Sequence, residues 1–171
     1  CSLKMNRHFK FLRTLYYSLF VMAIASCSLG NESLYFSSFS DGWQQDNPTT
    51  FTFTPSQVDT PMNLFLYLRN NDSYPFANIH IITELEDPLG HQVVDTLSYR
   101  LAQPNGEWLG EGLLVKESKL WYKEKHVFSV VGEYHLHVRP AMRHNEKANP
   151  ISVLKGITDV GLGIEQITVK E

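Results

Sequence analysis

The chain has 171 residues, of which 43% are hydrophobic and 12% aromatic; this composition excludes a disordered protein and fits one domain with a substantial core. The formal net charge is −3, and it becomes −7 without the first 26 residues, because these hold four of the 15 basic residues and none of the 18 acidic ones. A domain this acidic is a poor candidate for binding nucleic acid, which requires basic patches.

The N-terminal segment has the pattern of a secretory signal. A basic stretch follows Met5, and the apolar run over residues 15–25 is about eleven residues long, roughly half of what a membrane-spanning helix needs. We therefore predict a signal peptide over residues 5–26. Residues 1–4 precede a good initiator methionine, and we expect them to be an upstream translation artefact.

The end of the apolar run resembles a bacterial lipobox. Ile24-Ala25-Ser26-Cys27 places an aliphatic residue and two small residues before a cysteine. In such signals the cysteine is acylated and the chain is cut before it, so Cys27 is the predicted lipidation site, and two or more acyl chains would anchor it firmly. A free cysteine after an ordinary signal peptide is the alternative. Residues 27–33 are then the lipidated cysteine and a short polar tether.

Residues 34–171 are predicted to form an all-β domain. Alternating, β-branched and aromatic runs are separated by turn-forming residues, which indicates an antiparallel β-sandwich of immunoglobulin-like or jelly-roll-like type. Residues 62–69 form a nearly continuous apolar run, which indicates burial on both faces, and Asn105-Gly106 is a hairpin signal. Residues 151–157 are expected to form a helical turn. The predicted strands are 34–39, 50–54, 62–69, 78–85, 93–101, 108–115, 120–128, 132–139 and 160–169.

His135 and His137 are the best candidates for metal ligands. Residues two apart on a strand point to the same face, so both imidazoles could reach one ion, with His80 from a neighbouring strand as a third ligand. A solvated sheet face with the intervening residues turned inward explains the same alternation and is favoured. We therefore predict no metal and no other cofactor.

No catalytic pattern stands out in the predicted mature chain. It has neither a Gly-x-Ser-x-Gly elbow nor a His-Glu-x-x-His helix, and although two of its acids could still converge in space, an enzyme is not expected. Trp43, Trp108 and Trp121 could form a sugar-binding platform or fill the core. The glycines of residues 106–112 are interpreted as structural, and the basic stretch 116–126 as a solvated strand face that could also contact an acidic partner.

Several segments occur in an order that resembles one family, from the lipobox to Glu165. Together they are similar to the gliding motility-associated lipoprotein GldH family of the Bacteroidota. The segments are 68–71, 74–79, 95–96, 101–102, 106–112, 132–134, 142–143 and 154–165.

The resemblance implies a lipid-anchored outer-membrane protein of the gliding motility and type IX secretion machinery, acting through protein–protein contacts. A carbohydrate- or peptidoglycan-binding lipoprotein is the alternative, and the periplasmic or cell-surface side stays open. Asp95-Thr96-Leu97 also matches the Asp-Ser/Thr-aliphatic motif on which exported Bacteroidota proteins are O-glycosylated, which makes Thr96 a candidate site unless a strand hides its hydroxyl.

Overall fold

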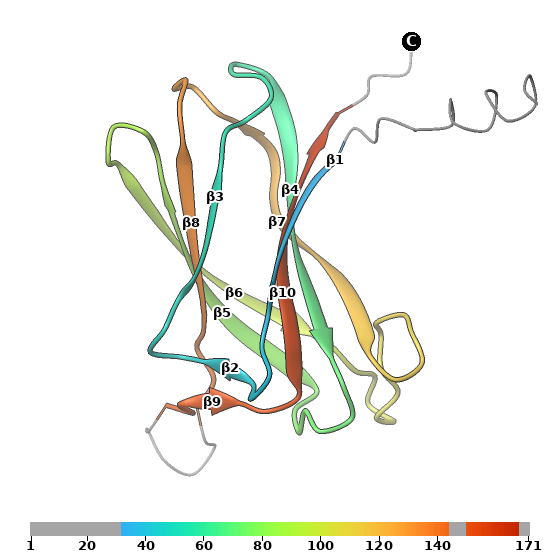
Figure 1. Ribbon diagram of the computed structural model, residues 1–171. Helices are drawn as coiled ribbons and strands as arrows, with labels where there is room; N and C mark the ends of the chain where they lie inside the picture. Colours follow the sequence, from blue (N-terminus) through green and yellow to red (C-terminus); the bar gives the residue numbers. More distant parts are fainter. Residues whose placement is uncertain (1–31, 144–149, 168–171) are drawn as a thin grey trace, which may run out of the picture. The chain divides into compact units, whose positions relative to one another are not determined.

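A computed structural model of the chain describes residues 32–143 and 150–167 (Figure 1). The described residues belong to one compact unit. Ten strands and no helix occur among the described residues, so none of these residues belongs to a helix able to cross a membrane. The predicted signal peptide, Cys27 and residues 28–31 of the predicted tether lie outside the described residues.

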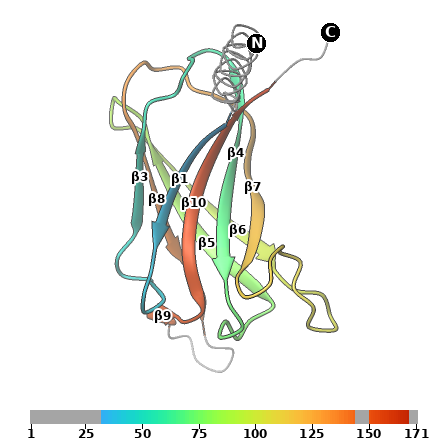
Figure 2. The ribbon, with the colours of Figure 1, turned by 45° about the vertical axis from the view of Figure 1, so that its right-hand side comes forward.

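Eight of the strands form two antiparallel four-stranded sheets that pack face to face (Figures 1 and 2). The first sheet consists, in spatial order, of β1 (Glu32–Ser38), β10 (Ile157–Gln166), β4 (Pro61–Asn70) and β7 (Lys116–Val127). The second consists of β3 (Thr49–Phe53), β8 (Tyr134–Pro140), β5 (Asn78–Glu86) and β6 (Gln92–Arg100). Two short strands, β2 (Trp43–Gln44) and β9 (Val153–Leu154), pair with each other. The all-β antiparallel sandwich is therefore confirmed, and the strand order is that of a jelly roll.

The core lies between the two sheets because side chains along each strand alternate between its faces. On β8 the inward residues Tyr134, Leu136 and Val138 are buried, while their neighbours are only half-buried. Strand β4 departs from this alternation, since Phe65 and Tyr67 on its outer face are only 5% and 7% exposed. The prediction that residues 62–69 are buried on both faces is therefore confirmed.

Two glycines of β10 explain how the outer face of β4 becomes covered. A Cβ atom on Gly161 would lie 2.7 Å from the ring of Phe36, and one on Gly163 would lie 2.6 Å from the ring of Tyr67. The absence of side chains therefore lets these rings lie close to the backbone of the central strand. Tyr67 also donates a hydrogen bond of 2.6 Å to Glu32, and burial together with this carboxylate raises the pKa of the phenol.

The predicted strand over residues 108–115 is wrong. This segment is a loop. Single bridges join Ala102 to Trp108 and Glu111 to Glu117, and Trp108 packs against the core. Gly112 has a φ of +123°, which side chains rarely adopt, and it breaks the extended backbone. The following strand β7 starts at Lys116, four residues earlier than predicted, while the Asn105-Gly106 turn is present, with Gly106 at a φ of +86°.

The predicted helical turn over residues 151–157 is also wrong, since β9 and the start of β10 occupy it. Gly156, at a φ of +83°, separates the two strands and lies so close to Ser73 and Tyr74 that a Cβ atom would be 2.2 Å from the Tyr74 nitrogen. β2 and β9 were not predicted, because two residues are too few for alternation to show. At the other end, β1 already includes Glu32, which the sequence analysis assigned to the tether.

Candidate functional site

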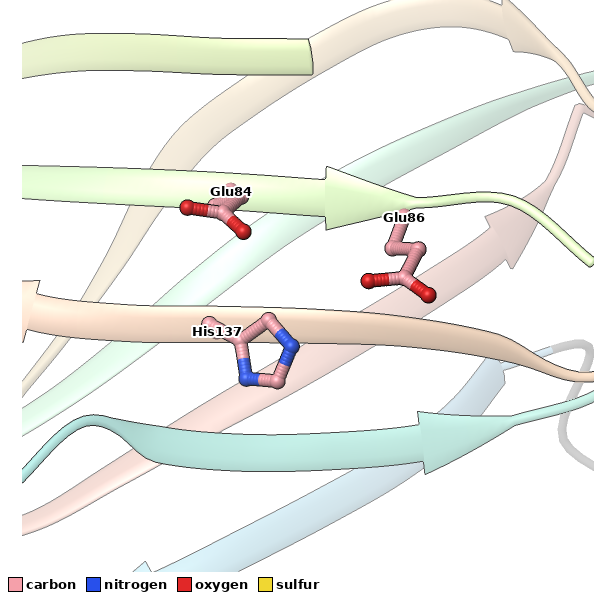
Figure 3. A group of neighbouring side chains, drawn as sticks. All are labelled: Glu84, Glu86 and His137. Carbon is pink, nitrogen blue, oxygen red and sulfur yellow. The ribbon is translucent and has the colours of Figure 1, made fainter. Parts of the chain in front are cut away.

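Four titratable side chains form an array on the outer face of the second sheet. Glu84 and Glu86 lie two residues apart on β5, and the antiparallel register places them opposite His137 and His135 of β8. Cβ atoms of such directly opposed residues lie about 4.5–5.5 Å apart. Glu84, Glu86 and His137 each offer one ligand atom, and these three atoms lie within 4.8 Å of one another. Figure 3 shows the three side chains on the same face of the sheet. We call these four residues the Glu–His array.

Strand β3 orients both imidazoles of the Glu–His array. Thr50 lies opposite His137 and Thr52 opposite His135 in the β3–β8 register. A hydrogen bond of 2.8 Å joins Thr50 Oγ1 to Nδ1 of His137, and one of 3.0 Å joins Thr52 Oγ1 to Nδ1 of His135. The two rings lie nearly parallel, with centroids 6.5 Å apart. Because Nδ1 is engaged in both rings, Nε2 is the nitrogen that remains for another partner.

The two histidines were predicted from the sequence, but the carboxylates beside them were not. His80, the suggested third ligand, lies four positions before Glu84 on β5, about 13 Å away along the strand, and its Nε2 is 3.3 Å from the Asn78 side-chain nitrogen. Glu84 and Glu86 lie opposite the histidines instead. The alternation of Glu84-Leu85-Glu86 at the end of a predicted strand was the signal that could have found them. The pairing of that strand with β8 was not visible in the sequence.

The residues around His135 do not form a hydrogen-bonded catalytic triad. Thr52, His135 and Glu133 follow the order of nucleophile, base and orienting carboxylate. However, Glu133 Oε1 is 3.7 Å from Nε2 of His135, which is too long for a hydrogen bond. These side chains do not line the pockets beside Lys119, Gln44 and Lys155.

A second candidate site lies along β7, the outermost strand of the first sheet. A groove of about 540 Å³ lies there and is lined by side chains of both charges, among them Arg100, Lys119, Glu111 and Glu117, and by the apolar Leu109. Such a mixture of apolar and oppositely charged groups suits a polypeptide better than a small uncharged ligand. We call this feature the β7 groove.

The β7 groove continues into a loop with unusually exposed apolar side chains. Leu109, Leu113, Leu114 and Val115 are 47%, 92%, 86% and 39% exposed, and we call residues 109–115 the apolar loop. Single exposed apolar residues are normal, but a contiguous group of them marks an interaction surface. This surface was not predicted from the sequence, because the same residues have the pattern of a strand.

The apolar loop and the entry of the chain into the domain lie at opposite ends of the sandwich. Lys116, directly after the loop, pairs with Asn70 at the end of β4, whereas Glu32 pairs with Glu165, which pairs with Asn63 near the start of β4. Figure 2 shows the yellow loop at one end and the start of the blue strand β1 at the other.

Two of the cations on β7 are paired within the domain. Lys119 forms ion pairs with Glu165 and Glu32, and although burial opposes its charge, the hydrogen bond to Glu165 raises the pKa of its ammonium. Lys123 lies 2.7 Å from Asp95 on β6. The basic stretch of residues 116–126 therefore offers an acidic partner less positive charge than its composition suggests.

Thr96 and the three tryptophans are not among the residues of the Glu–His array or the lining of the β7 groove. Thr96 is exposed on β6, an edge strand, so the strand does not hide its hydroxyl, and O-glycosylation there stays a prediction. Trp43 is completely buried and Trp108 packs against the core, which leaves Trp121 as the exposed tryptophan. The three rings therefore do not form a sugar-binding platform. Cys27 lies outside the described residues, and its lipidation also stays a prediction.

Comparisons with known proteins identify relatives of the chain. The family model described as "GldH lipoprotein" matches residues 35–164. The "Gliding motility lipoprotein GldH homolog" of Christiangramia forsetii is 43% identical over 125 residues, which are 72% of this chain and 77% of the relative. The "Gliding motility lipoprotein GldH" of Flavobacterium johnsoniae is 41% identical over 132 residues, 77% of this chain and 82% of the relative.

These matches and the fold define the class of the protein, a bacterial lipoprotein whose described residues form a jelly-roll domain. The chain belongs to the GldH lipoprotein family, which confirms the resemblance seen in the sequence. Among solved structures, the VP2 subviral particle of infectious bursal disease virus is 12% identical, covers 79% of this chain and 33% of the viral one, and gives a TM-score of only 0.35.

Proposed function

We propose that the protein is a lipid-anchored outer-membrane component of the gliding motility and type IX secretion machinery and acts through protein–protein contacts rather than catalysis. Membership of the GldH family supports the role in gliding, since the names of both relatives refer to gliding motility. The apolar loop is the observation that carries the proposed mode of action, because it is the most exposed apolar segment among the described residues.

The position of the apolar loop fits a tethered binding domain. Four residues separate Cys27 from Glu32, so five Cα–Cα steps join them and span at most about 18 Å. The ten residues of β4 extend about 33 Å from this end of the domain to the other. A domain anchored at Cys27 therefore holds its Glu32 end near the lipid and presents the apolar loop about 30 Å further out.

The β7 groove and the apolar loop together suit a protein partner with an apolar anchor and a mixed-charge flank. Leu113 and Leu114 are positioned to enter an apolar pocket of the partner, since central apolar anchors dominate interface energies. Arg69 and Glu117, which form an ion pair of 2.6 Å beside the groove, belong to its polar rim.

Co-purification from the native outer membrane tests this function. The tagged full-length protein is solubilised in detergent beside three variants: Cys27→Ala, the double variant Leu113→Asp with Leu114→Asp, and Leu89→Asp. Leu89 is a matched control, because it is 68% exposed and lies in the β5–β6 turn at the other end of the sandwich. The recovered proteins are then identified by mass spectrometry.

The proposal predicts that gliding or secretion components are recovered with the wild type and with Leu89→Asp. They should be lost from the double variant, and Cys27→Ala should no longer fractionate with the outer membrane. Recovery of the wild type alone, or only with glycan fragments, would refute the machinery role and favour the carbohydrate-binding alternative. Retention of the same partners by the double variant would refute the role of the apolar loop.

A further inference from the structure

We propose that Glu84, Glu86 and His137 bind one divalent zinc ion on the outer face of the second sheet. The three side chains come from two neighbouring strands whose register is continuous over this region, so the backbone sets their spacing. Their ligand atoms lie within 4.8 Å of one another. This inference concerns a different face of the domain from the apolar loop and does not depend on the proposed partner.

The spacing is close to what a tetrahedral zinc site requires. Ligand bonds of 2.0–2.1 Å place neighbouring ligand atoms about 3.4 Å apart, so the three atoms need to close by no more than about 1.4 Å. Glutamate side chains reach this by small rotations about χ2 and χ3, and both carboxylates are only half-buried. The strands themselves need not move.

The surrounding residues already orient two of the three ligands. When Nδ1–H of His137 donates the 2.8 Å hydrogen bond to the Thr50 hydroxyl, Nε2 carries the lone pair that binds metal. The side-chain amide of Gln92 donates a hydrogen bond of 2.9 Å to Glu86. Hydrogen bonds that orient the ligand side chains are typical of metal sites.

The charge of the cluster also favours a cation. Two carboxylates two residues apart on one strand face repel each other when both are ionised. Among the described residues, no lysine or arginine forms an ion pair with either Glu84 or Glu86, although Arg139 lies two positions beyond His137 on the same face. A divalent ion would neutralise the two carboxylates.

The donor set points to zinc rather than to magnesium or calcium. Those two ions prefer oxygen ligands alone, whereas zinc accepts imidazole nitrogen together with carboxylate oxygen. Three protein ligands leave a fourth position, which faces solvent because the site lies on the sheet surface. A water molecule fills this position in the proposed site.

Titration of the full-length protein in detergent with Zn²⁺ tests the site. The protein carries no histidine tag and is first stripped of metal with a chelator. Calorimetry should show one saturable site per chain, and Co²⁺ used as a probe should give the visible d–d absorption of a low-coordinate site. Glu84→Gln and His137→Gln should each weaken Zn²⁺ binding at least about 10-fold. Thr50→Val should also weaken Zn²⁺ binding, because Thr50 orients the His137 ring.

His91→Gln is the matched control, because His91 is exposed and lies 2.8 Å from Asp87 outside the Glu–His array. This variant should keep the affinity and the cobalt spectrum of the wild type. Thermal unfolding of each metal-free variant confirms that the exposed substitutions leave the fold intact. The absence of saturable Zn²⁺ binding by the wild type, or binding that Glu84→Gln and His137→Gln retain unchanged, would overturn the proposal.

Discussion

Replacing Gly163 by alanine tests how the outer face of the first sheet is packed. The added methyl group would lie 2.6 Å from Cε2 of Tyr67, while carbon atoms in contact are normally about 3.5–4.0 Å apart, so the ring must move by about 1 Å. Such overpacking costs about 1–3 kcal/mol. Because alanine also restricts the unfolded chain, which stabilises by about 0.4–1 kcal/mol, we expect a net loss of about 1–2 kcal/mol.

A double-mutant cycle separates this steric cost from any other effect of the substitution. In a Tyr67→Ala background the ring is absent, and Glu32, the next nearest side chain, is half-exposed and can move. Gly163→Ala should then be neutral or stabilising by up to about 1 kcal/mol. The free energy of unfolding is measured in urea by tryptophan fluorescence, and an unchanged slope shows that the comparison is valid.

Gly161→Ala provides the comparison for this cycle. The atoms nearest to its methyl group would be two of the Phe36 ring and the carbonyl oxygen of Tyr35. Phe36 packs on Tyr67, with ring centroids 5.8 Å apart, so Tyr67→Ala should lower the cost of Gly161→Ala only indirectly and by less than it lowers that of Gly163→Ala. If Gly163→Ala costs the same in both backgrounds, within about 0.5 kcal/mol, the two residues are not coupled and the packing argument is wrong.

Three further predictions concern the core and its edges, and urea unfolding checks each of them. Trp43→Ala should lower the free energy of unfolding by about 3–5 kcal/mol, because the ring is fully buried and its Nε1–H donates a hydrogen bond of 3.2 Å to Thr49. A loss below about 1 kcal/mol would contradict this prediction. Tyr99→Phe should lower the free energy of unfolding by about 0.5–1.5 kcal/mol, because the Tyr99 hydroxyl donates a hydrogen bond to the Trp121 carbonyl and so joins β6 to β7. An unchanged free energy of unfolding would show that this hydrogen bond contributes nothing to stability. Burial lowers the pKa of His126 below its usual 6.5, so the unfolded chain binds more protons and stability should fall as the pH drops below 6.5. His126→Gln should reduce this loss between about pH 7.5 and about pH 5.5, and an identical pH profile would refute it.

The domain class could be predicted from the sequence because its signals are local. Alternation along residues 132–139 follows directly from strand geometry, and the same pattern identified which of these side chains face the core. The continuous apolar run over residues 62–69 likewise indicated a central strand. Errors arose where local patterns compete: Leu113, Leu114 and Val115 have strand-like character, but Gly112 at a positive φ prevents an extended strand.

The sequence by itself determined that the domain is an antiparallel sandwich, that it belongs with the GldH lipoproteins, and that His135 and His137 share one face. Only the tertiary structure decided which strands are neighbours, because pairing depends on packing between segments far apart in the chain. The pairing of β5 with β8 brings Glu84 and Glu86 beside the histidines, and the pairing of β4 with β7 places the apolar loop opposite the entry of the chain. Neither candidate site could be recognised without these long-range contacts.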